Sequence, residues 1–294
     1  MMPITALLSK AIHARVMRAC FVLLSCVFVV PSHSQEAGCG LAPELERDVN
    51  KLLGASSVYD YSGTLLVEYG SDREFIAVNS RQGQGEGSLT RLNRQADAPL
   101  ETVAVQPLDP TSACGLARFY AFSIESEQVV AGRAARRISI RPRDTLRLGY
   151  LMDIDAESGL PLRVVSATPE GQVLERFEFA QFQLGQAIEH VAVLAPKSAP
   201  DVFQFANLPP GFVVIGQGTS PVAHKVVSDG LASVSIFIEP QPRALAAGEG
   251  VALRGSTLAY TRGIPNNFLI TVMGEIPITT ARLLADAVRV PQVP

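Results

Sequence analysis

The side chains best suited to bind a charged ligand are arginines gathered in one short stretch. Planar guanidinium groups form paired hydrogen bonds with phosphates and carboxylates. If residues 134–141 form one strand, Arg133, Arg137 and Arg141 share a face of it. We expect a lipid-phosphate or acidic-peptide site here, and the alternative is a solvated strand face neutralised by acids on neighbouring strands. The six arginines within 15 residues are Arg133, Arg136, Arg137, Arg141, Arg143 and Arg147, of which Arg133, Arg137, Arg141 and Arg143 are the candidate lipid or anion ligands.

Three acidic side chains follow shortly after this cluster. Asp153, Asp155 and Glu157 alternate at the end of a predicted strand, and carboxylate oxygens are the ligands that calcium prefers. The glycine-centred loop of a calcium site is absent from the sequence. We therefore predict a solvated strand face that leads into a turn, and no metal site.

A third pattern, Ser228-Asp229-Gly230 with His224 nearby, raises the possibility of a hydrolase. The nucleophile elbow G-x-S-x-G is missing, and Asp-Gly between two β-patterned runs is first a hairpin turn. His190 and His224 are the only histidines after residue 34, and they fall in different predicted domains. Because a histidine triad lacks its parts, we predict no catalytic residue, no cofactor and no enzyme activity.

The first residues have the composition of an export signal. Lys10, Arg15 and Arg18 precede an unbroken apolar run over residues 19–30, which Pro31 ends. About 20 apolar residues are needed to cross a bilayer, so this run is too short, and the small-residue pattern at 32–34 suits cleavage. We predict a cleaved signal peptide over residues 1–34 and a periplasmic protein. An uncleaved anchor and lipoprotein processing at Cys26 are the alternatives.

Cleavage would change both the charge and the cysteine count. The whole chain has a net charge of −3, and losing three of its 25 basic side chains and none of its 28 acidic ones leaves −6. This charge argues against a general nucleic-acid binder. Of the four cysteines, Cys39 and Cys114 would remain. An oxidising compartment favours a disulfide between them, and two free buried thiols are the alternative.

The rest of the chain follows a mainly β pattern. Residues 41–53 have the apolar spacing of a helix that ends at Gly54. Short turns between the β-patterned runs leave no room for crossover helices, so the neighbours must pair antiparallel. Phe177, Phe179 and Phe182 break strict alternation, which indicates either a bulge or a strand end near Ala180. The expected strands are residues 61–67, 75–78, 134–140, 147–154, 160–165 and 173–182.

A proline-rich stretch then separates a second group of strands. We expect a linker over residues 197–210, a mobile loop over 239–250, and a last helix over 279–288 capped by Thr279 or Thr280. Gly211 and Gly230 follow Pro210 and Asp229, where turns call for positive φ. The strands expected after the linker are residues 212–215, 223–227, 232–238, 256–261 and 268–273.

Several phrases carry a resemblance to one family. They run in a fixed order along the chain, and the densest occupies residues 228–240. They resemble the MucB/RseB family of periplasmic regulators of sigma-E (AlgU-type) factors, over roughly residues 45–288, with a less familiar stretch at 104–129. The phrases include Tyr61-Ser62-Gly63-Thr64, Val130-Ala131-Gly132-Arg133, Leu208-Pro209-Pro210-Gly211-Phe212, Ser228-Asp229-Gly230-Leu231-Ala232 and Met273-Gly274-Glu275-Ile276-Pro277.

The resemblance implies a fold and a function. It implies a LolA-like, lipid-sensing antiparallel half-barrel covered by helices over residues 38–196, and a smaller partner-binding α+β domain over 211–290. Members bind the periplasmic part of a membrane anti-sigma factor, protect it from proteolysis, and are released by lipid or lipopolysaccharide. They are not enzymes.

Two further expectations follow from the resemblance. The partner-binding residues would be Ser228, Asp229, Gly230, Leu231, Phe237 and Glu239. A homodimer is left open. The rival hypothesis is a periplasmic lipid or lipoprotein carrier of the LolA type, for which the first domain alone would suffice.

Overall fold

The computed structural model describes residues 39–81, 86–92, 112–187, 202–219, 222–242, 248–264 and 267–290. The predicted signal peptide and His190 lie outside these ranges. The described residues all belong to one compact unit. Among the described residues, no helix has the length and apolar character needed to cross a membrane.

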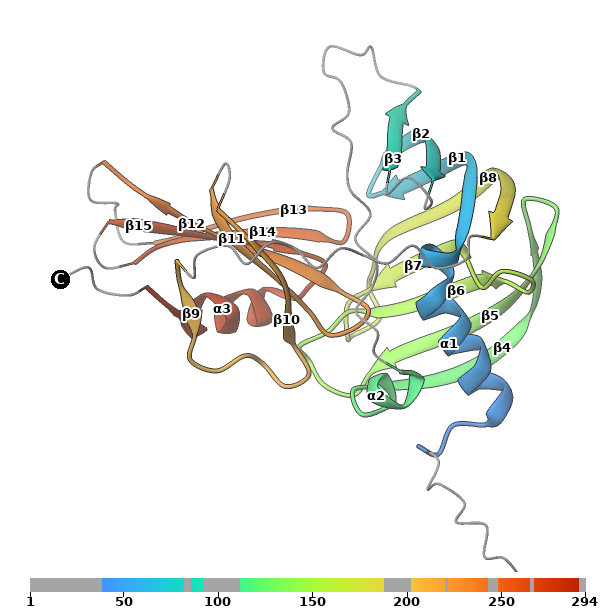
Figure 1. Ribbon diagram of the computed structural model, residues 1–294, viewed down its shortest axis with the longest axis horizontal. Coiled ribbons are helices and arrows are strands. Elements are labelled where there is room, and N and C mark those ends of the chain that lie inside the picture. The colour runs from blue at the N-terminus through green and yellow to red at the C-terminus, as the bar shows by residue number, and fades with distance from the viewer. Residues whose placement is uncertain are drawn as a thin grey trace, which may run out of the picture. The chain divides into compact units, whose positions relative to one another are not determined.

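The first part of the chain forms an eight-stranded antiparallel sheet (Figure 1). Its strand order is β3-β2-β1-β8-β7-β6-β5-β4, so the chain makes one hairpin meander from β4 to β8 and then returns to pair β8 with β1. The strands are β1 (Tyr59–Tyr69), β2 (Asp72–Arg81), β3 (Glu86–Arg91), β4 (Tyr120–Val130), β5 (Arg133–Pro142), β6 (Gly149–Asp155), β7 (Pro161–Ala167) and β8 (Val173–Ala187).

Of the two alternatives expected near Ala180, the bulge is present in β8, and the strand continues past it. Thr64 of β1 pairs with Gln181 while Leu65 pairs with Phe179, so Ala180 is the extra residue. The bulge lets the phenylalanines on both sides of it pack together, with the Phe179 and Phe182 ring centroids 4.9 Å apart. Gly63 lies beneath them, where a Cβ would stand 2.2 Å from the Gln181 carbonyl oxygen. The close strand approach therefore requires glycine at this position.

Two helices cover the apolar face of this sheet. Helix α1 (Pro43–Val58) begins with proline in its first turn and buries Leu45, Val49 and Leu52 against the sheet. The prediction that Gly54 ends the helix is wrong. Ala55 is 2% exposed, so burying it requires one more helical turn after Gly54.

The short helix α2 (Ala113–Ala117) lies in the stretch that the sequence left unassigned. Ser112 caps it by accepting a hydrogen bond from the Gly115 amide, and Leu116 is fully buried in the same core as α1. A disulfide joins Cys114 to Cys39, with the Cα atoms 5.2 Å apart. It fastens α2 to the residues that precede α1.

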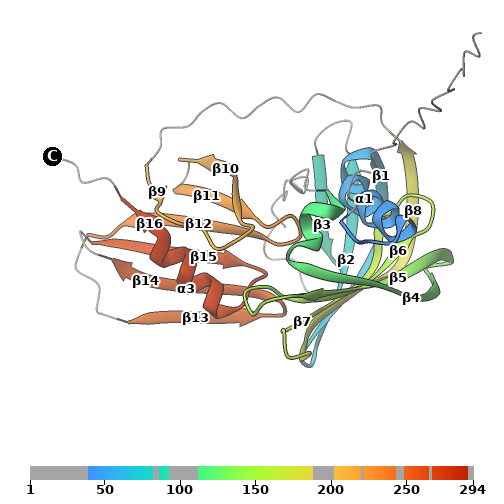
Figure 2. The same cartoon turned by 90° about the horizontal axis from the view of Figure 1, so that it is seen from below.

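The second part of the chain forms a six-stranded antiparallel sheet with order β10-β11-β12-β15-β14-β13. Helix α3 (Ile278–Ala287) packs on one face of it (Figure 2). A two-stranded ribbon of β9 (Gln204–Phe205) and β16 (Val288–Arg289) completes this part. The strands of the large sheet are β10 (Val213–Gly218), β11 (Ala223–Ser228), β12 (Ser233–Pro240), β13 (Glu249–Arg254), β14 (Thr257–Ile264) and β15 (Phe268–Gly274).

The fold class is the mainly β, α+β arrangement that the sequence predicts, with corrections at three places. Residues 239–240 end β12 and residues 249–250 begin β13, so both ends of the expected loop are strand. Pro277 is the N-cap of α3, and neither Thr279 nor Thr280 caps it. Phe203, within the expected linker, is 1% exposed and belongs to the core of the second sheet.

Candidate functional site

The arginine cluster and the acidic cluster were considered as separate sites in the sequence, but their side chains form salt bridges with each other. Arg137 on β5 lies directly opposite Asp153 on β6, and their side chains meet at 2.7 Å. Asp153 in turn lies opposite Arg163 on β7 (3.2 Å), and Arg163 lies opposite Glu178 on β8 (3.1 Å). Directly opposed side chains share a face, so charges of alternating sign cross four strands.

The second arginine of the predicted site is held in the same way. Arg133 donates to both oxygens of Asp155 at 2.6 and 2.9 Å, and to Glu157 at 2.7 Å. Burial alone would raise the pKa of Asp155, but Arg133 and the Ser158 amide and hydroxyl outweigh it and lower that pKa. The Asp155 carboxylate is thus hydrogen-bonded by protein donors on both of its oxygens.

The remaining arginines differ among themselves. Arg141 is exposed on β5, and Arg143 donates to the carbonyls of Ala117 and Tyr120 at 3.1 and 3.2 Å. Arg136 points to the helix side of the sheet and pairs with Glu44 and Asp48 of α1. Of the four candidate anion ligands, two are therefore neutralised by carboxylates. Arg133 and Arg137 fit the alternative of a strand face paired with neighbouring acids.

Asp229, a candidate partner-binding residue, lies at a contact between the two sheets. The Asp-Gly turn between β11 and β12 is confirmed, and Gly230 has the expected positive φ of 98°. The Asp229 side chain is fully buried. One of its oxygens accepts from the amides of Leu231 and Ala232 at 3.0 and 2.9 Å. The other accepts from Tyr120 (2.7 Å) and Arg147 (2.9 Å) of the first part of the chain.

Arg147 is the central residue of this contact, and its role was not foreseen. Its side chain is fully buried, pairs with Asp144 and Asp229, and donates to the carbonyl of Pro210. The Phe119 ring lies 4.4 Å from the guanidinium carbon, a cation–π geometry. We call Tyr120, Arg147 and Asp229 the junction cluster. Burial and the Asp229 charge raise the pKa of Tyr120 well above its usual value, so its hydroxyl keeps its proton and donates it.

Two side-chain contacts place the β13–β14 hairpin beside the first sheet. Glu175 of β8 accepts from the Ser256 amide (2.9 Å) and hydroxyl (3.0 Å) at the hairpin turn. Arg254 donates to the Tyr69 hydroxyl and to Glu74, at 2.7 and 2.5 Å. Both contacts join residues that are far apart in the sequence, because the hairpin follows the strands of the first sheet by about 80 residues or more.

Threonines of α3 form a third contact between the two parts of the chain. Thr280 donates to the Leu146 carbonyl at 2.6 Å, and Thr279 donates to the Thr145 carbonyl at 3.4 Å. These hydroxyls therefore bind residues that precede β6, which explains why neither of them caps the helix.

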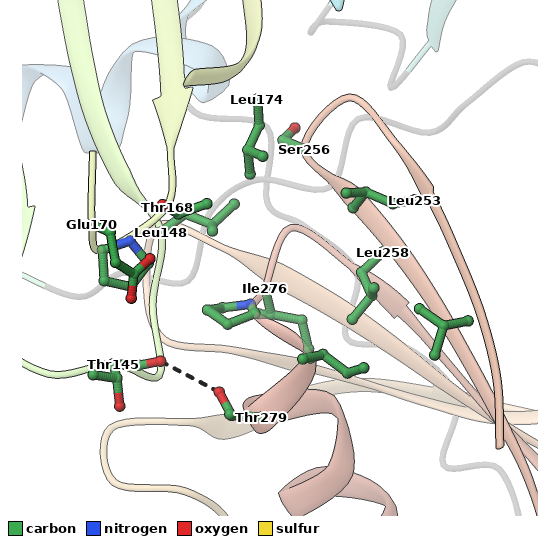
Figure 3. A pocket seen from close by; sticks show the side chains of 14 residues that line it. Thr145, Leu148, Thr168, Glu170, Leu174, Leu253, Ser256, Leu258, Ile276 and Thr279 are labelled. Carbon is green, nitrogen blue, oxygen red and sulfur yellow. Dashed lines mark hydrogen bonds between the residues drawn. The ribbon is translucent and has the colours of Figure 1, made fainter. Parts of the chain in front are cut away.

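An apolar pocket of about 450 Å³ opens between these contacts (Figure 3). Leu148 and Leu174 line it from the first part of the chain. The second part contributes apolar side chains of β13, of β14, of the turn between β15 and α3, and of the start of α3, which are Val251, Leu253, Leu258, Ile276 and Ile278. None of these residues was a candidate from the sequence, because each fits ordinary core packing equally well.

The other candidate residues are dispersed. Ser228 and His224 stand at opposite parts of β11, where the Ser228 hydroxyl accepts from the Gly230 amide and the His224 ring contacts the Val222 carbonyl. Phe237 lies beside the His224 ring, with centroids 5.7 Å apart. Leu231 is partly buried and packs against the core of the first sheet. Glu239 is half-buried near the end of β12.

Comparison with known proteins identifies the family to which this chain is similar. Residues 69–197 match the MucB/RseB N-terminal domain, and residues 197–289 match the MucB/RseB C-terminal domain. The sigma factor AlgU regulatory protein MucB of Pseudomonas aeruginosa is 32% identical over 247 residues, which cover 76% of each chain. The chain belongs to the MucB/RseB family. The sigma-E factor regulatory protein RseB of Escherichia coli K12 is 26% identical over 59% of this chain and 60% of that protein.

Solved structures agree with the MucB/RseB assignment. MucB in complex with MucA(peri) is 27% identical with a TM-score of 0.63, and it covers 85% of this chain and all of that chain. A structure of MucB alone reaches a TM-score of 0.65 at 26% identity, over 85% of this chain and 99% of that one. The two-sheet architecture of this chain is thus that of MucB.

Within this MucB/RseB chain, one sequence signal could have identified the junction cluster. Arg147 precedes the apolar Leu148 and lies apart from the strand that carries the other arginines. A guanidinium next to a buried apolar run requires a buried carboxylate, and the Asp-Gly turn supplies it. Gly211 completes the packing, because a Cβ there would stand 2.6 Å from the Phe119 ring.

Proposed function

We propose that this chain is a periplasmic, non-enzymatic regulator that binds the periplasmic part of a membrane anti-sigma factor. The observation that carries the proposal is the similarity over both parts of the chain to MucB, a sigma factor regulatory protein whose structure is known in complex with MucA(peri). Binding would protect the anti-sigma factor from proteolysis, and lipid or lipopolysaccharide would release it. The predicted signal peptide supports the periplasmic location.

The arrangement of the two sheets supports a regulatory role. A ligand releases a partner only when it favours the unbound state, so lipid and partner must have opposing effects on one equilibrium. A coupling free energy of about 1–3 kcal/mol changes affinity roughly 5- to 150-fold. The junction cluster is a suitable element for such coupling, because its buried charges depend on groups from both parts of the chain.

Calorimetric titration tests this function. The mature chain would be titrated with the purified periplasmic region of a membrane anti-sigma factor from the same organism, with and without lipopolysaccharide. We expect binding with a micromolar or lower Kd, weakened by lipopolysaccharide. Lipid binding without any binding of the anti-sigma region would contradict the proposal and leave the lipid carrier in its place.

A further inference from the structure

Strand β13 combines two features that rarely occur together on a protein surface. It is the last strand of the six-stranded sheet, and no described strand pairs with its outer edge. Val251 and Leu253 are 51% and 58% exposed, although both are large apolar side chains. They are two residues apart, so they share one face of the strand, and both line the apolar pocket.

The open edge indicates what kind of molecule would bind. An unpaired strand edge presents amide and carbonyl groups that another extended polypeptide can satisfy. Every second side chain of an added strand would point to the face that carries Val251 and Leu253, and so toward the pocket. The pocket volume of about 450 Å³ falls in the range of roughly 300–1,000 Å³ typical of ligand sites.

Charge distinguishes a peptide from a lipid headgroup. Glu170 is the single charged side chain among the residues that line the pocket, and it is exposed. Its carboxylate would repel an anionic headgroup and attract a lysine or arginine. The nearby Arg254 already pairs with Glu74 and Tyr69, so it offers little compensation to an anion.

The edge is also held in place before any partner arrives. Arg254, at the end of β13, and Ser256, at the hairpin turn, are both hydrogen-bonded to the first sheet. A strand that is already ordered loses little conformational entropy when a partner pairs with it. These contacts therefore favour recognition by strand addition.

We propose that an extended segment of a partner polypeptide adds to β13 as a further strand, with alternate apolar side chains in the pocket and a basic side chain near Glu170. This inference rests on the proposed function, because the partner in question is the periplasmic region of the anti-sigma factor. It deepens that function by naming the surface and the mode of binding.

The first test removes the apolar side chains from the edge. In the Val251→Ser, Leu253→Ser double variant, we expect the Kd for the anti-sigma periplasmic region to rise about 10- to 100-fold, the effect of losing buried apolar contacts. The matched control is Val213→Ser, Val214→Ser on β10, the opposite edge strand, where the side chains are 47% and 44% exposed. The control should change the Kd less than about threefold. A larger rise in Kd for the β10 control than for the β13 variant would overturn the inference.

The second test reverses the charge at the rim. Glu170→Lys should weaken binding about two- to fivefold and reduce its sensitivity to salt, as expected for one exposed charge pair. Glu125→Lys, on the edge strand β4 of the same eight-stranded sheet, is the control and should have no effect. Stronger binding by Glu170→Lys would contradict a basic contact on the partner.

Amide hydrogen exchange tests the strand pairing itself. Amides of β13 that exchange rapidly in the free protein should become protected when the anti-sigma region binds, and those of β10 should not. If the wild type fails to bind this region, the proposed function fails together with the inference. If the wild type binds and the β13 variants bind equally well, only the inference fails. Loss of binding to phosphatidylglycerol vesicles alone in the β13 variants would assign the pocket to lipid and overturn it.

Discussion

At the scale of single residues, the decisive feature is a buried carboxylate with four donors. Asp229 accepts two backbone amides, the Tyr120 hydroxyl and the Arg147 guanidinium. Removing one partner of a buried ion pair leaves the other charge uncompensated. We expect Asp229→Ala to lower the free energy of unfolding by about 3–5 kcal/mol, measured by urea denaturation.

An exposed acid provides the comparison. Glu157, whose side chain is 72% exposed, pairs with Arg133 on the surface. We expect Glu157→Ala to cost less than about 1 kcal/mol, the usual range of a surface pair. Equal effects at the two positions would show that the junction cluster contributes nothing beyond an ordinary surface contact.

The pH dependence of stability should report Glu275, which directly follows β15. Burial, and next the nearby Glu175 charge, raise the pKa of Glu275. Because the folded state then binds the proton more tightly than the unfolded state, the stability that this group contributes is present at acidic pH. It is lost as the pH rises through the raised pKa.

Glu275→Gln removes this dependence. We expect a higher Tm than the wild type at neutral pH and little difference near pH 4, because the wild-type carboxyl is protonated there. Thermal unfolding followed by circular dichroism between pH 4 and 8 would measure it. Parallel curves for the two proteins would show that the Glu275 carboxyl titrates normally.

At the scale of elements, the features that depend on local residue spacing were predicted from the sequence. The bulge at Ala180 and the Asp229-Gly230 turn follow from side-chain alternation and turn chemistry, and both are present. The end of α1 and the role of Thr280 were wrong, because tertiary contacts decide them. Ala55 is buried by packing, and the Thr280 hydroxyl binds the Leu146 carbonyl instead of a helix amide. The pocket could not be foreseen, because its residues meet only after the hairpin of β13 and β14 reaches the first sheet.

The disulfide stabilises the position of the short helix α2. Cys39 and Cys114 are 75 residues apart, and their bond fastens α2 beside α1. Closing a loop of this length restricts the unfolded chain, an effect of about 4 kcal/mol. We expect the Cys39→Ser, Cys114→Ser variant to lose roughly that much stability in guanidinium denaturation. Adding reductant should destabilise the wild type and leave the variant unchanged.

At the scale of the whole molecule, the contacts between the sheets should make unfolding cooperative. The junction cluster buries charges that depend on both parts of the chain, and Glu175 and Arg254 add hydrogen bonds at the β13–β14 hairpin. Neither sheet can unfold alone without exposing unpaired partners on the other. We expect one heat-capacity peak in scanning calorimetry of the wild type, and two peaks or a broad one in Asp229→Ala. Two separate peaks in the wild type would contradict this.

The pairing of β1 with β8 has a consequence for how the chain acquires its structure. Tyr61 pairs with Leu184, more than 100 residues later, so β1 has no partner on that side until β8 has been made. Contacts this distant in sequence slow folding, because a long loop must close before they form. The hairpins of β4 to β8 can assemble first from neighbouring segments. We therefore expect the strands β1 to β3 to join last, and we expect a chain shortened before residue 173 to leave the β1 edge exposed to aggregation.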